Sequence, residues 1–178
     1  LALDDYRDGR VFFVGDSAHI VPIFGVRGLN NGFSDAANIG WKLGWVLNNK
    51  AGKELLNSYS PERRGATIDV FYNSSKSSKF MTPSTYGWKL MRDAALSVAL
   101  KHKFAGELAN PRQFTPYKYS ESTAIIKDTN ENFLGGPKPG ELLPEIKIDA
   151  GYLTDLLGEG FTILCFNKDT SKKLDEII

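Results

Sequence analysis

The sequence has few of the residues that build metal centres or covalent cross-links. A single cysteine, Cys165, excludes an internal disulfide and argues against a cysteine-based zinc site. The two histidines, His19 and His102, are too far apart in sequence to indicate a metal site, so no metal ligands are predicted. The formal net charge of the 178 residues is only +1, which gives no electrostatic reason to expect binding to nucleic acid or to an acidic membrane surface.

Long apolar runs are also missing from the chain. No run approaches the roughly 20 residues that a transmembrane helix needs, and the first five residues lack the basic and apolar regions of a signal peptide. We therefore expect a cytoplasmic protein without a membrane partner. The hydrophobic share of 42% is ordinary for a globular domain, so a core can form.

The first apolar segment predicts a strand that ends in a tight turn. Residues 11–14 form a short, fully apolar run, which is typical of a buried strand, and Gly15 and Asp16 follow it directly. In open α/β sheets, ligands bind at the carboxyl ends of the strands. Asp16 is therefore a candidate to accept hydrogen bonds from the hydroxyls of a sugar or polyol.

A glycine-containing loop and a long helix follow this turn. Gly25 and Gly28 allow the backbone to turn sharply and to approach a flat ligand closely. Helical spacing predicts a helix over residues 31–48, capped by Asn30 or Asn31. Its free N–H groups and positive dipole end would face the same place as Asp16 and would stabilise negative charge on a ligand.

Small residues recur every fourth position along this helix. Ala36, Gly40 and Gly44 form a smooth stripe, and we expect the helix to pack against another element through it. The sequence alone allows two interpretations of Asp35. It is either an acid placed near the positive end of the helix dipole or a residue with a role in the site.

Two more helices and a break are predicted farther along. Ser60, Pro61 and an acid at position 62 are a typical helix start, and that helix is expected to run to about residue 75. Apolar spacing predicts another helix over 86–103. The glycine and proline cluster at 135–140 indicates a domain junction, with a short helix at 152–157 and a buried strand at 161–166 beyond it.

Residues 9–75 resemble the second FAD fingerprint of the flavin-dependent aromatic hydroxylases, the family that includes p-hydroxybenzoate and phenol hydroxylases. The family pattern is a Gly-Asp after a strand, an Ala-His, a Pro, a Gly, a Gly-Leu-Asn, an Asp and an Asn-x-x-Trp-Lys-Leu helix. A Tyr-x-x-Glu-Arg segment follows. The matching residues are Gly15-Asp16, Ala18-His19, Pro22, Gly25, Gly28-Leu29-Asn30, Asp35, Asn38 to Leu43, and Tyr59 to Arg63.

The resemblance implies a site for FAD and a role for each matching residue. Asp16 would bind the ribityl chain, and Pro22 would lie by the flavin ring. The backbone amides of Leu29 and Asn30 would meet the pyrimidine edge. The glycines of the pattern, Gly25 and Gly28, complete the cofactor-binding set, and the resemblance implies no catalytic side chain in this chain.

It also implies an activity. The intact enzyme would use NADPH or NADH to reduce FAD and would hydroxylate an aromatic, phenol-like substrate through a flavin hydroperoxide. Two departures from the family pattern concern the loop: Ile23 replaces a second proline, and Val26-Arg27 replaces Gly-Gln. The first fingerprint, a Gly-x-Gly-x-x-Gly after a strand, does not occur here, so we expect this chain alone to bind FAD weakly or not at all.

The predicted fold class is an α/β fragment with long helices that ends in the start of a thioredoxin-like domain. Residues 1–115 would form the C-terminal part of the FAD-binding domain, 116–140 a linker and 141–178 a partial thioredoxin-like domain, as in family members with a third domain. From the positions of the first and last predicted strands we also expect the chain to be a fragment.

A second enzyme interpretation keeps the flavin but changes the reaction, for example to hydroxylation of a non-phenolic polyketide. Two further alternatives remain open. Asp16, Ser17 and His19 could suggest a hydrolase, but a catalytic triad needs side chains that converge in space and not along one turn. The other alternative is a non-catalytic remnant that acts as an interaction or homodimerisation module through the helix at 86–103 and the C-terminal section. His19 on its own is interpreted as a structural histidine.

Overall fold

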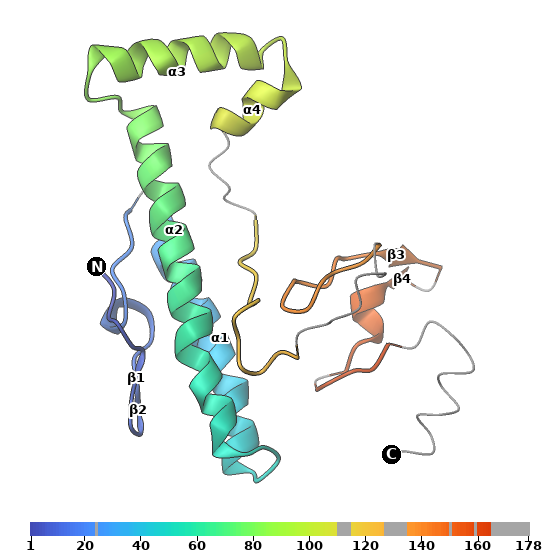
Figure 1. Cartoon of the computed structure of the whole chain (residues 1–178). Helices are drawn as coiled ribbons and strands as arrows, with labels where there is room; N and C mark the ends of the chain where they lie inside the picture. Colours follow the sequence, from blue (N-terminus) through green and yellow to red (C-terminus); the bar gives the residue numbers. More distant parts are fainter. Residues whose placement is uncertain (24, 110–114, 127–134, 150, 159, 165–178) are drawn as a thin grey trace. The chain divides into compact units, whose positions relative to one another are not determined.

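The computed structural model describes residues 1–23, 25–109, 115–126, 135–149, 151–158 and 160–164 (Figure 1). The chain divides into two compact units, Leu1–Leu142 and Leu143–Ile178. None of the described helices is both long and apolar enough to cross a membrane.

The first unit opens with a small antiparallel hairpin. Strand β1 (Arg7–Asp8) pairs with β2 (Val11–Phe12), and Gly9 has a positive φ of 56° in the turn between them. The prediction of a buried strand over 11–14 was wrong in extent and in burial, because the strand has two residues and Val11 is 54% exposed. A strand is buried only where both faces of its sheet are covered, and β2 belongs to a two-stranded hairpin in which Val11 remains exposed.

Helix α1 (Arg27–Leu47) begins four residues before the predicted start. Its N-cap is Val26, which has left-handed backbone angles and makes no side-chain capping hydrogen bond. The prediction that Asn30 or Asn31 caps the helix was therefore wrong. Both residues lie within the first two turns, and the amide of Asn30 donates to the carbonyl of Val26 at 3.3 Å.

The packing face of α1 differs from the predicted stripe of small residues. Ala36 is exposed, and a Cβ added to Gly40 or Gly44 would meet no described atom within 4 Å. The buried residues lie on another face and are mostly polar: Asn31, Asp35, Asn38, Ile39 and Lys42. This face packs because α2 supplies partners for its charged and amide groups, a contact that the spacing of small residues does not reveal.

Helix α2 (Tyr59–Met81) follows a short 3-10 helix, η2 (Lys53–Ser58), and lies beside α1 (Figure 1). The helix extends past the predicted end at residue 75. Ser60, the predicted cap, lies inside the first turn, and its hydroxyl accepts the backbone N–H of Tyr6 at 2.9 Å. That bond ties the N-terminal segment to the start of α2.

A small apolar core joins these elements. It consists of Tyr6, Ala18, Ile39, Leu56 and Tyr59. The hydroxyl of Tyr59 donates to the carbonyl of Phe13 at 2.7 Å, which satisfies a polar group at the edge of the core. The core therefore fixes the segment on either side of the Gly15 turn against α1 and α2.

Helix α3 (Tyr86–Ala99) and helix α4 (Lys103–Ala109) complete the helical part of the first unit and pack against each other. The predicted helix over 86–103 is confirmed as α3, which ends four residues earlier than predicted, and α4 begins at the last predicted residue. Thr85 caps α3 by accepting the N–H of Trp88 at 3.4 Å. None of the residues of α3 is fully buried.

The second unit contains one more hairpin. Strand β3 (Lys147–Ile148) pairs antiparallel with β4 (Gly151–Tyr152), and the 3-10 helix η3 (Leu153–Leu156) follows. The predicted short helix at 152–157 is confirmed as this 3-10 turn. The predicted strand at 161–166 was wrong for residues 161–164, which are irregular, and its last two residues lie outside the described residues.

Candidate functional site

The turn after β2 presents Asp16 to solvent. Residues Gly15–Ser17 form the 3-10 turn η1, and Gly15 has a φ of 58°, which favours glycine. The hydroxyl of Ser17 closes the turn, since it accepts the N–H of Val14 at 3.0 Å and donates to the Val14 carbonyl at 2.8 Å. Ser17, and not Asp16, therefore makes the side-chain bond that stabilises the turn, and the Asp16 carboxylate is exposed.

The N-terminus of α1 lies next to this turn. A Cβ on Gly15 would lie 3.7 Å from the Cα of Gly32, so the turn and the helix approach each other closely. Leu29 and Asn30 are exposed in the first helical turn, and Pro22 is exposed in the loop before it. An uncapped helix start offers backbone N–H groups and a positive dipole end to a ligand.

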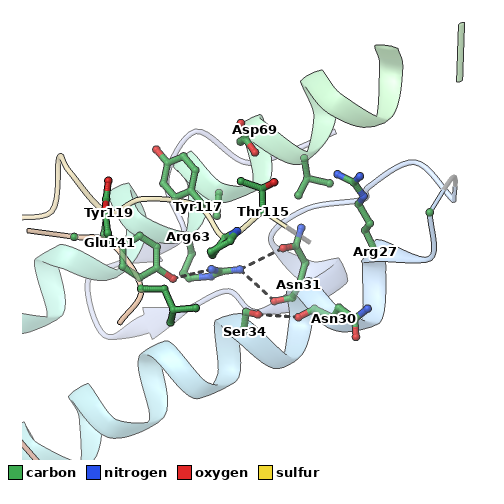
Figure 2. A pocket seen from close by; sticks show the side chains of 16 residues that line it. Arg27, Asn30, Asn31, Ser34, Arg63, Asp69, Thr115, Tyr117, Tyr119 and Glu141 are labelled. Carbon is green, nitrogen blue, oxygen red and sulfur yellow. Dashed lines mark hydrogen bonds between the residues drawn. The ribbon is translucent and has the colours of Figure 1, made fainter. Parts of the chain in front are cut away.

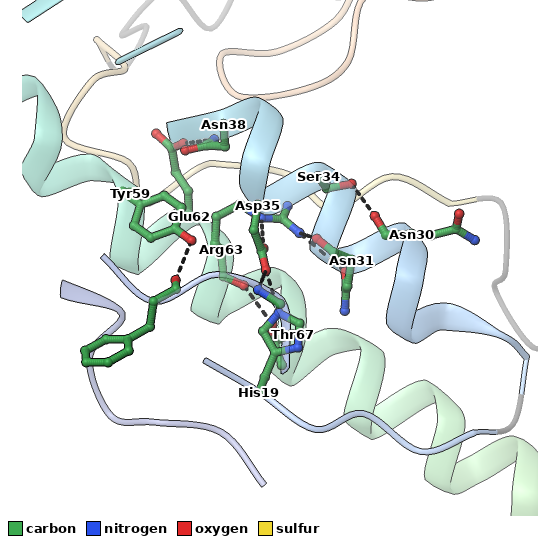
Figure 3. A network of polar contacts seen from close by, with 12 residues as sticks. His19, Asn30, Asn31, Ser34, Asp35, Asn38, Tyr59, Glu62, Arg63 and Thr67 are labelled. Carbon is green, nitrogen blue, oxygen red and sulfur yellow. Dashed lines mark hydrogen bonds and ion pairs between the residues drawn. The ribbon is translucent and has the colours of Figure 1, made fainter. Parts of the chain in front are cut away.

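Asp35 is the centre of a buried polar network behind the turn (Figure 3). Its Oδ2 accepts the backbone N–H of Gly15 at 3.0 Å and lies 2.6 Å from Nε2 of His19. Its Oδ1 accepts Nε–H of Arg63 at 2.7 Å. The side chain is completely buried, so these three donors replace the water that the carboxylate loses.

The surroundings of Asp35 keep it ionised. Burial alone raises the pKa of this carboxyl, but the hydrogen bonds from His19 and Arg63 outweigh that effect and the pKa is lowered below its ordinary value. Burial also lowers the pKa of the Arg63 guanidinium. The interactions with Tyr119 and Asp35 raise this pKa by more than burial lowers it, so the net shift is upward.

Arg63 extends the network to a distant part of the chain. One terminal nitrogen donates to the hydroxyl of Tyr119 at 2.9 Å, and the other lies 3.3 Å from Oδ1 of Asn31. A single guanidinium thus joins α1, α2 and the segment around residue 119. The resemblance pointed to Glu62 and Arg63 as part of a family segment, but it gave neither residue a partner.

A second buried network lies farther along the same helix pair. Glu62 accepts hydrogen bonds from Nζ of Lys42 and Nδ2 of Asn38, both at 2.6 Å, and also from the hydroxyl of Ser122. Burial lowers the pKa of the Lys42 ammonium, and Glu62 offsets only part of that effect. Sequence reasoning missed this network. The available signal was that positions 35, 38, 39 and 42 share one helical face although three of them are polar.

A cavity of about 580 Å³ opens beside the first network, within the first unit (Figure 2). Its size is in the range of small-molecule sites. Of the residues predicted from sequence to hold a cofactor, Gly25 and Asn30 line it, whereas Asp16, Pro22, Gly28 and Leu29 do not. The other lining residues come from α1, α2 and two later segments: Arg27, Asn31, Ser34, Arg63, Ala66, Asp69, Val70, Thr115, Pro116, Tyr117, Tyr119, Gly140, Glu141 and Leu142.

Within the described residues, no group of three or more His, Cys, Asp or Glu side chains is placed to hold a metal ion. His19 contacts Asp35 and the ring of Tyr6 and is 2% exposed. Such a buried position suits the structural role predicted for it. Ser17 is engaged in the η1 turn, while Asp16 points its exposed carboxylate to solvent, so the three residues do not form a triad.

The lowered pKa of Asp35 makes a testable prediction about acid stability. The pKa of the Asp35 carboxyl is lower in the folded state than in the unfolded state, where it is about 3.9. The ionised carboxyl therefore stabilises the fold at pH values above about 3.9. This stabilisation is lost as the pH falls through the folded-state pKa. We expect the difference in unfolding free energy between the wild type and Asp35→Asn to be largest near neutral pH and to shrink below pH ~4. Urea denaturation of both proteins over this pH series measures the difference, and a difference that does not change with pH would contradict the assignment.

Comparison with known proteins identifies the class. The family model described as "FAD binding domain" matches residues 2–74. The chain is 28% identical over 176 residues to a 3-(3-hydroxy-phenyl)propionate/3-hydroxycinnamic acid hydroxylase of Mycolicibacterium gilvum, covering 96% of this chain and 31% of the relative. It is 36% identical over 163 residues to a rifampicin monooxygenase of Rhodococcus hoagii, covering 90% and 31%.

Solved structures of similar fold are also flavin enzymes or hydroxylases. The rebeccamycin biosynthetic enzyme RebC with reduced flavin matches with a TM-score of 0.71 and 26% identity, over 98% of this chain and 36% of that one. The anhydrotetracycline hydroxylase OxyS from Streptomyces rimosus matches with a TM-score of 0.61 and 28% identity, over 85% and 29%.

Residues 2–74 thus belong to the FAD-binding domain family, and the chain is similar to aromatic hydroxylases over part of their length. The chain spans about a third of the length of the curated relatives it matches. The cofactor of this family is FAD.

The geometry of the site fits this cofactor. The start of the 21-residue helix α1 has no side-chain cap, and Leu29 and Asn30 are exposed in its first turn. An exposed carboxylate, Asp16, lies in the adjoining turn, and a Cβ added to Gly15 would be in van der Waals contact with Gly32 at 3.7 Å. Hydrogen-bond donors for an anionic edge and an acceptor for hydroxyl groups are therefore both present.

Proposed function

We propose that this chain forms part of the FAD site of a monooxygenase that hydroxylates an aromatic, phenol-like substrate and takes its reducing equivalents from NADPH or NADH. Two observations support the proposal. The relatives are hydroxylases and a monooxygenase, and an exposed acid, Asp16, adjoins an uncapped helix start. When bound, FAD supplies the electron transfer and oxygen activation, and the protein supplies binding and orientation.

Each residue of the proposed site has a role that follows from its chemistry. The carboxylate of Asp16 accepts hydrogen bonds from ribityl hydroxyls, and the amides of Leu29 and Asn30 face the pyrimidine edge, where negative charge develops on reduction. Pro22 lies against the ring. The remaining two residues, Gly25 and Gly28, allow close backbone approach, and a Cβ on the second would already lie 3.5 Å from Val21.

The domain assignment is part of the same proposal. Residues 1–115 are the FAD-binding part, 116–140 a linker and 141–178 the start of a thioredoxin-like domain. Residues 141–178 hold one cysteine, Cys165, whereas a dithiol site needs two. A cytoplasmic location and a homodimer complete the proposal.

The substitution Asp16→Ala tests the flavin site. In the full-length protein we expect FAD affinity to fall about ten- to a hundredfold, because a charge-assisted hydrogen bond is worth roughly 1.5–3 kcal/mol. FAD fluorescence titration measures the affinity, and the bound flavin gives the wild type its visible absorption band.

An exposed acid in the neighbouring hairpin provides the control. Asp8→Ala removes the same charge away from the η1 turn and is expected to leave FAD affinity unchanged. Melting of both apoproteins shows whether either change acts on the fold. Unchanged FAD affinity in Asp16→Ala together with a clearly destabilised apoprotein would leave Asp16 a structural role only.

The second candidate function is a non-catalytic interaction or dimerisation module, and the exposure of apolar residues on α3 favours it. Trp88, Leu90 and Met91 are 42%, 58% and 51% exposed. Under this alternative, the purified full-length protein is colourless and binds no FAD. A charged substitution such as Leu90→Asp then converts a dimer into a monomer in analytical ultracentrifugation.

A further inference from the structure

We propose that Asp35 is a positioning residue for the cofactor, which holds residues 15–23, called here the flavin loop, in the conformation that binds FAD. The inference rests on the proposed function and adds to it a residue that is not itself a flavin ligand. Asp35 is fully buried and acts through the loop.

The first argument is where Asp35 touches the loop. One carboxylate oxygen, Oδ2, accepts the N–H of Gly15 at 3.0 Å and lies 2.6 Å from Nε2 of His19. These two contacts fall on either side of Asp16, one residue before it and three residues after it. A single buried oxygen therefore fixes both ends of the turn that presents the Asp16 carboxylate.

The second argument is that Asp35 is itself held from two other elements. Arg63 of α2 donates to Oδ1 at 2.7 Å, and the same guanidinium donates to the hydroxyl of Tyr119 at 2.9 Å. Asp35, His19 and Arg63 are 0%, 2% and 4% exposed. A ligand-binding turn supported by buried, hydrogen-bonded side chains is preorganised, and preorganisation lowers the cost of binding.

The third argument concerns what the site requires of position 35. Three donors converge on the two carboxylate oxygens, so both oxygens must be acceptors. An asparagine has one oxygen and one NH₂ group, and in either amide orientation the NH₂ group faces at least one of these donors. The variant Asp35→Asn keeps the size of the side chain but should release either Arg63 or the two loop contacts.

Glu62 provides a matched control for loss of a buried charge. It is also buried between α1 and α2, with a cation at 2.6 Å, but its described hydrogen-bond partners are Asn38, Lys42 and Ser122 and none belongs to the flavin loop. Glu62→Gln therefore removes a comparable charge from the same helix pair without touching residues 15–23.

The experiment compares FAD affinity and apoprotein melting for the full-length wild type, Asp35→Asn and Glu62→Gln. We expect Asp35→Asn to raise the Kd for FAD about tenfold or more, and Glu62→Gln to change it less than about threefold at a similar loss of melting temperature. Equal effects of the two variants on Kd would overturn the inference. A wild type that binds no FAD would instead overturn the proposed function, so the two failures are distinguishable.

A second pair of variants keeps the inference testable if Asp35→Asn does not fold. His19→Ala removes one loop contact, whereas His19→Gln retains a side-chain N–H that can reach Asp35. We expect weaker FAD binding in the first variant and recovery in the second. Hydrogen–deuterium exchange of the apoprotein should show faster exchange at the Gly15 amide in His19→Ala but not in His19→Gln. Identical FAD affinity and identical exchange in the two variants would overturn the positioning role.

Discussion

Replacing Arg63 with methionine is expected to lower the free energy of unfolding by about 3–5 kcal/mol, the usual cost of leaving a buried charge without its partner. The guanidinium is 4% exposed and contacts Asp35, Tyr119 and Asn31. Methionine fills similar volume but offers no donor, so the carboxylate of Asp35 keeps only Gly15 and His19. Urea denaturation of the chain, followed by circular dichroism, measures the loss.

The adjacent arginine is the natural control for this prediction. Arg64 pairs with Asp4 at 3.2 Å, but its side chain is 38% exposed and the Asp4 side chain is fully exposed. Exposed ion pairs contribute at most about 1 kcal/mol, so Arg64→Met should cost far less than Arg63→Met. Similar losses for the two variants would show that the buried network around Asp35 does not stabilise the fold.

The second large effect is expected at the Lys42–Glu62 pair. Lys42→Met leaves the buried carboxylate of Glu62 without a cation, with hydrogen bonds only from Asn38 and Ser122 among the described residues, and should cost about 3–5 kcal/mol. The double variant Lys42→Met/Glu62→Gln removes both charges. The single amide oxygen of glutamine can accept from Asn38, and its NH₂ group can donate to the hydroxyl of Ser122. We therefore expect the double variant to be more stable than Lys42→Met alone.

This comparison is a double-mutant cycle, and its outcome has a clear meaning. Recovery in the double variant would show that the cost comes from the unpaired charge and not from the loss of lysine packing. If the losses of the two single variants simply add, the pair does not interact energetically. Chemical denaturation at neutral pH measures all four proteins.

The two networks give the helix pair an unusual interface for a small domain. Asp35 and Lys42 lie on the face of α1 that packs against α2, and both are fully buried. Such interfaces tolerate substitution poorly, because removing either partner of an ion pair leaves the other as an unpaired buried charge. The same intolerance fixes the relative placement of α1, α2 and the η1 turn, on which the proposed FAD site depends.

The family and the cofactor could be predicted from sequence because the relevant signals are local. The Gly15-Asp16 turn, the Gly28-Leu29-Asn30 segment and the helix that follows are contiguous, and the order of residues along the chain carries the information. The long helices could be predicted for the same reason, since helical periodicity is a property of neighbouring residues. The start of α1 could not, because a left-handed Val26 is an unfavourable cap that only its surroundings select.

The sequence by itself determined the class of protein, the FAD cofactor and the existence of the two long helices. Only the tertiary structure decided which face of α1 is buried, because the partners of Asp35 and Lys42 lie on another helix, 20 to 28 residues away in sequence. It also decided that Asp35 contacts Gly15 and His19 and is not only an acid near the helix dipole. The physical reason is the same in both cases: a charged side chain is buried only where donors from distant segments converge on it, and no local pattern encodes that convergence.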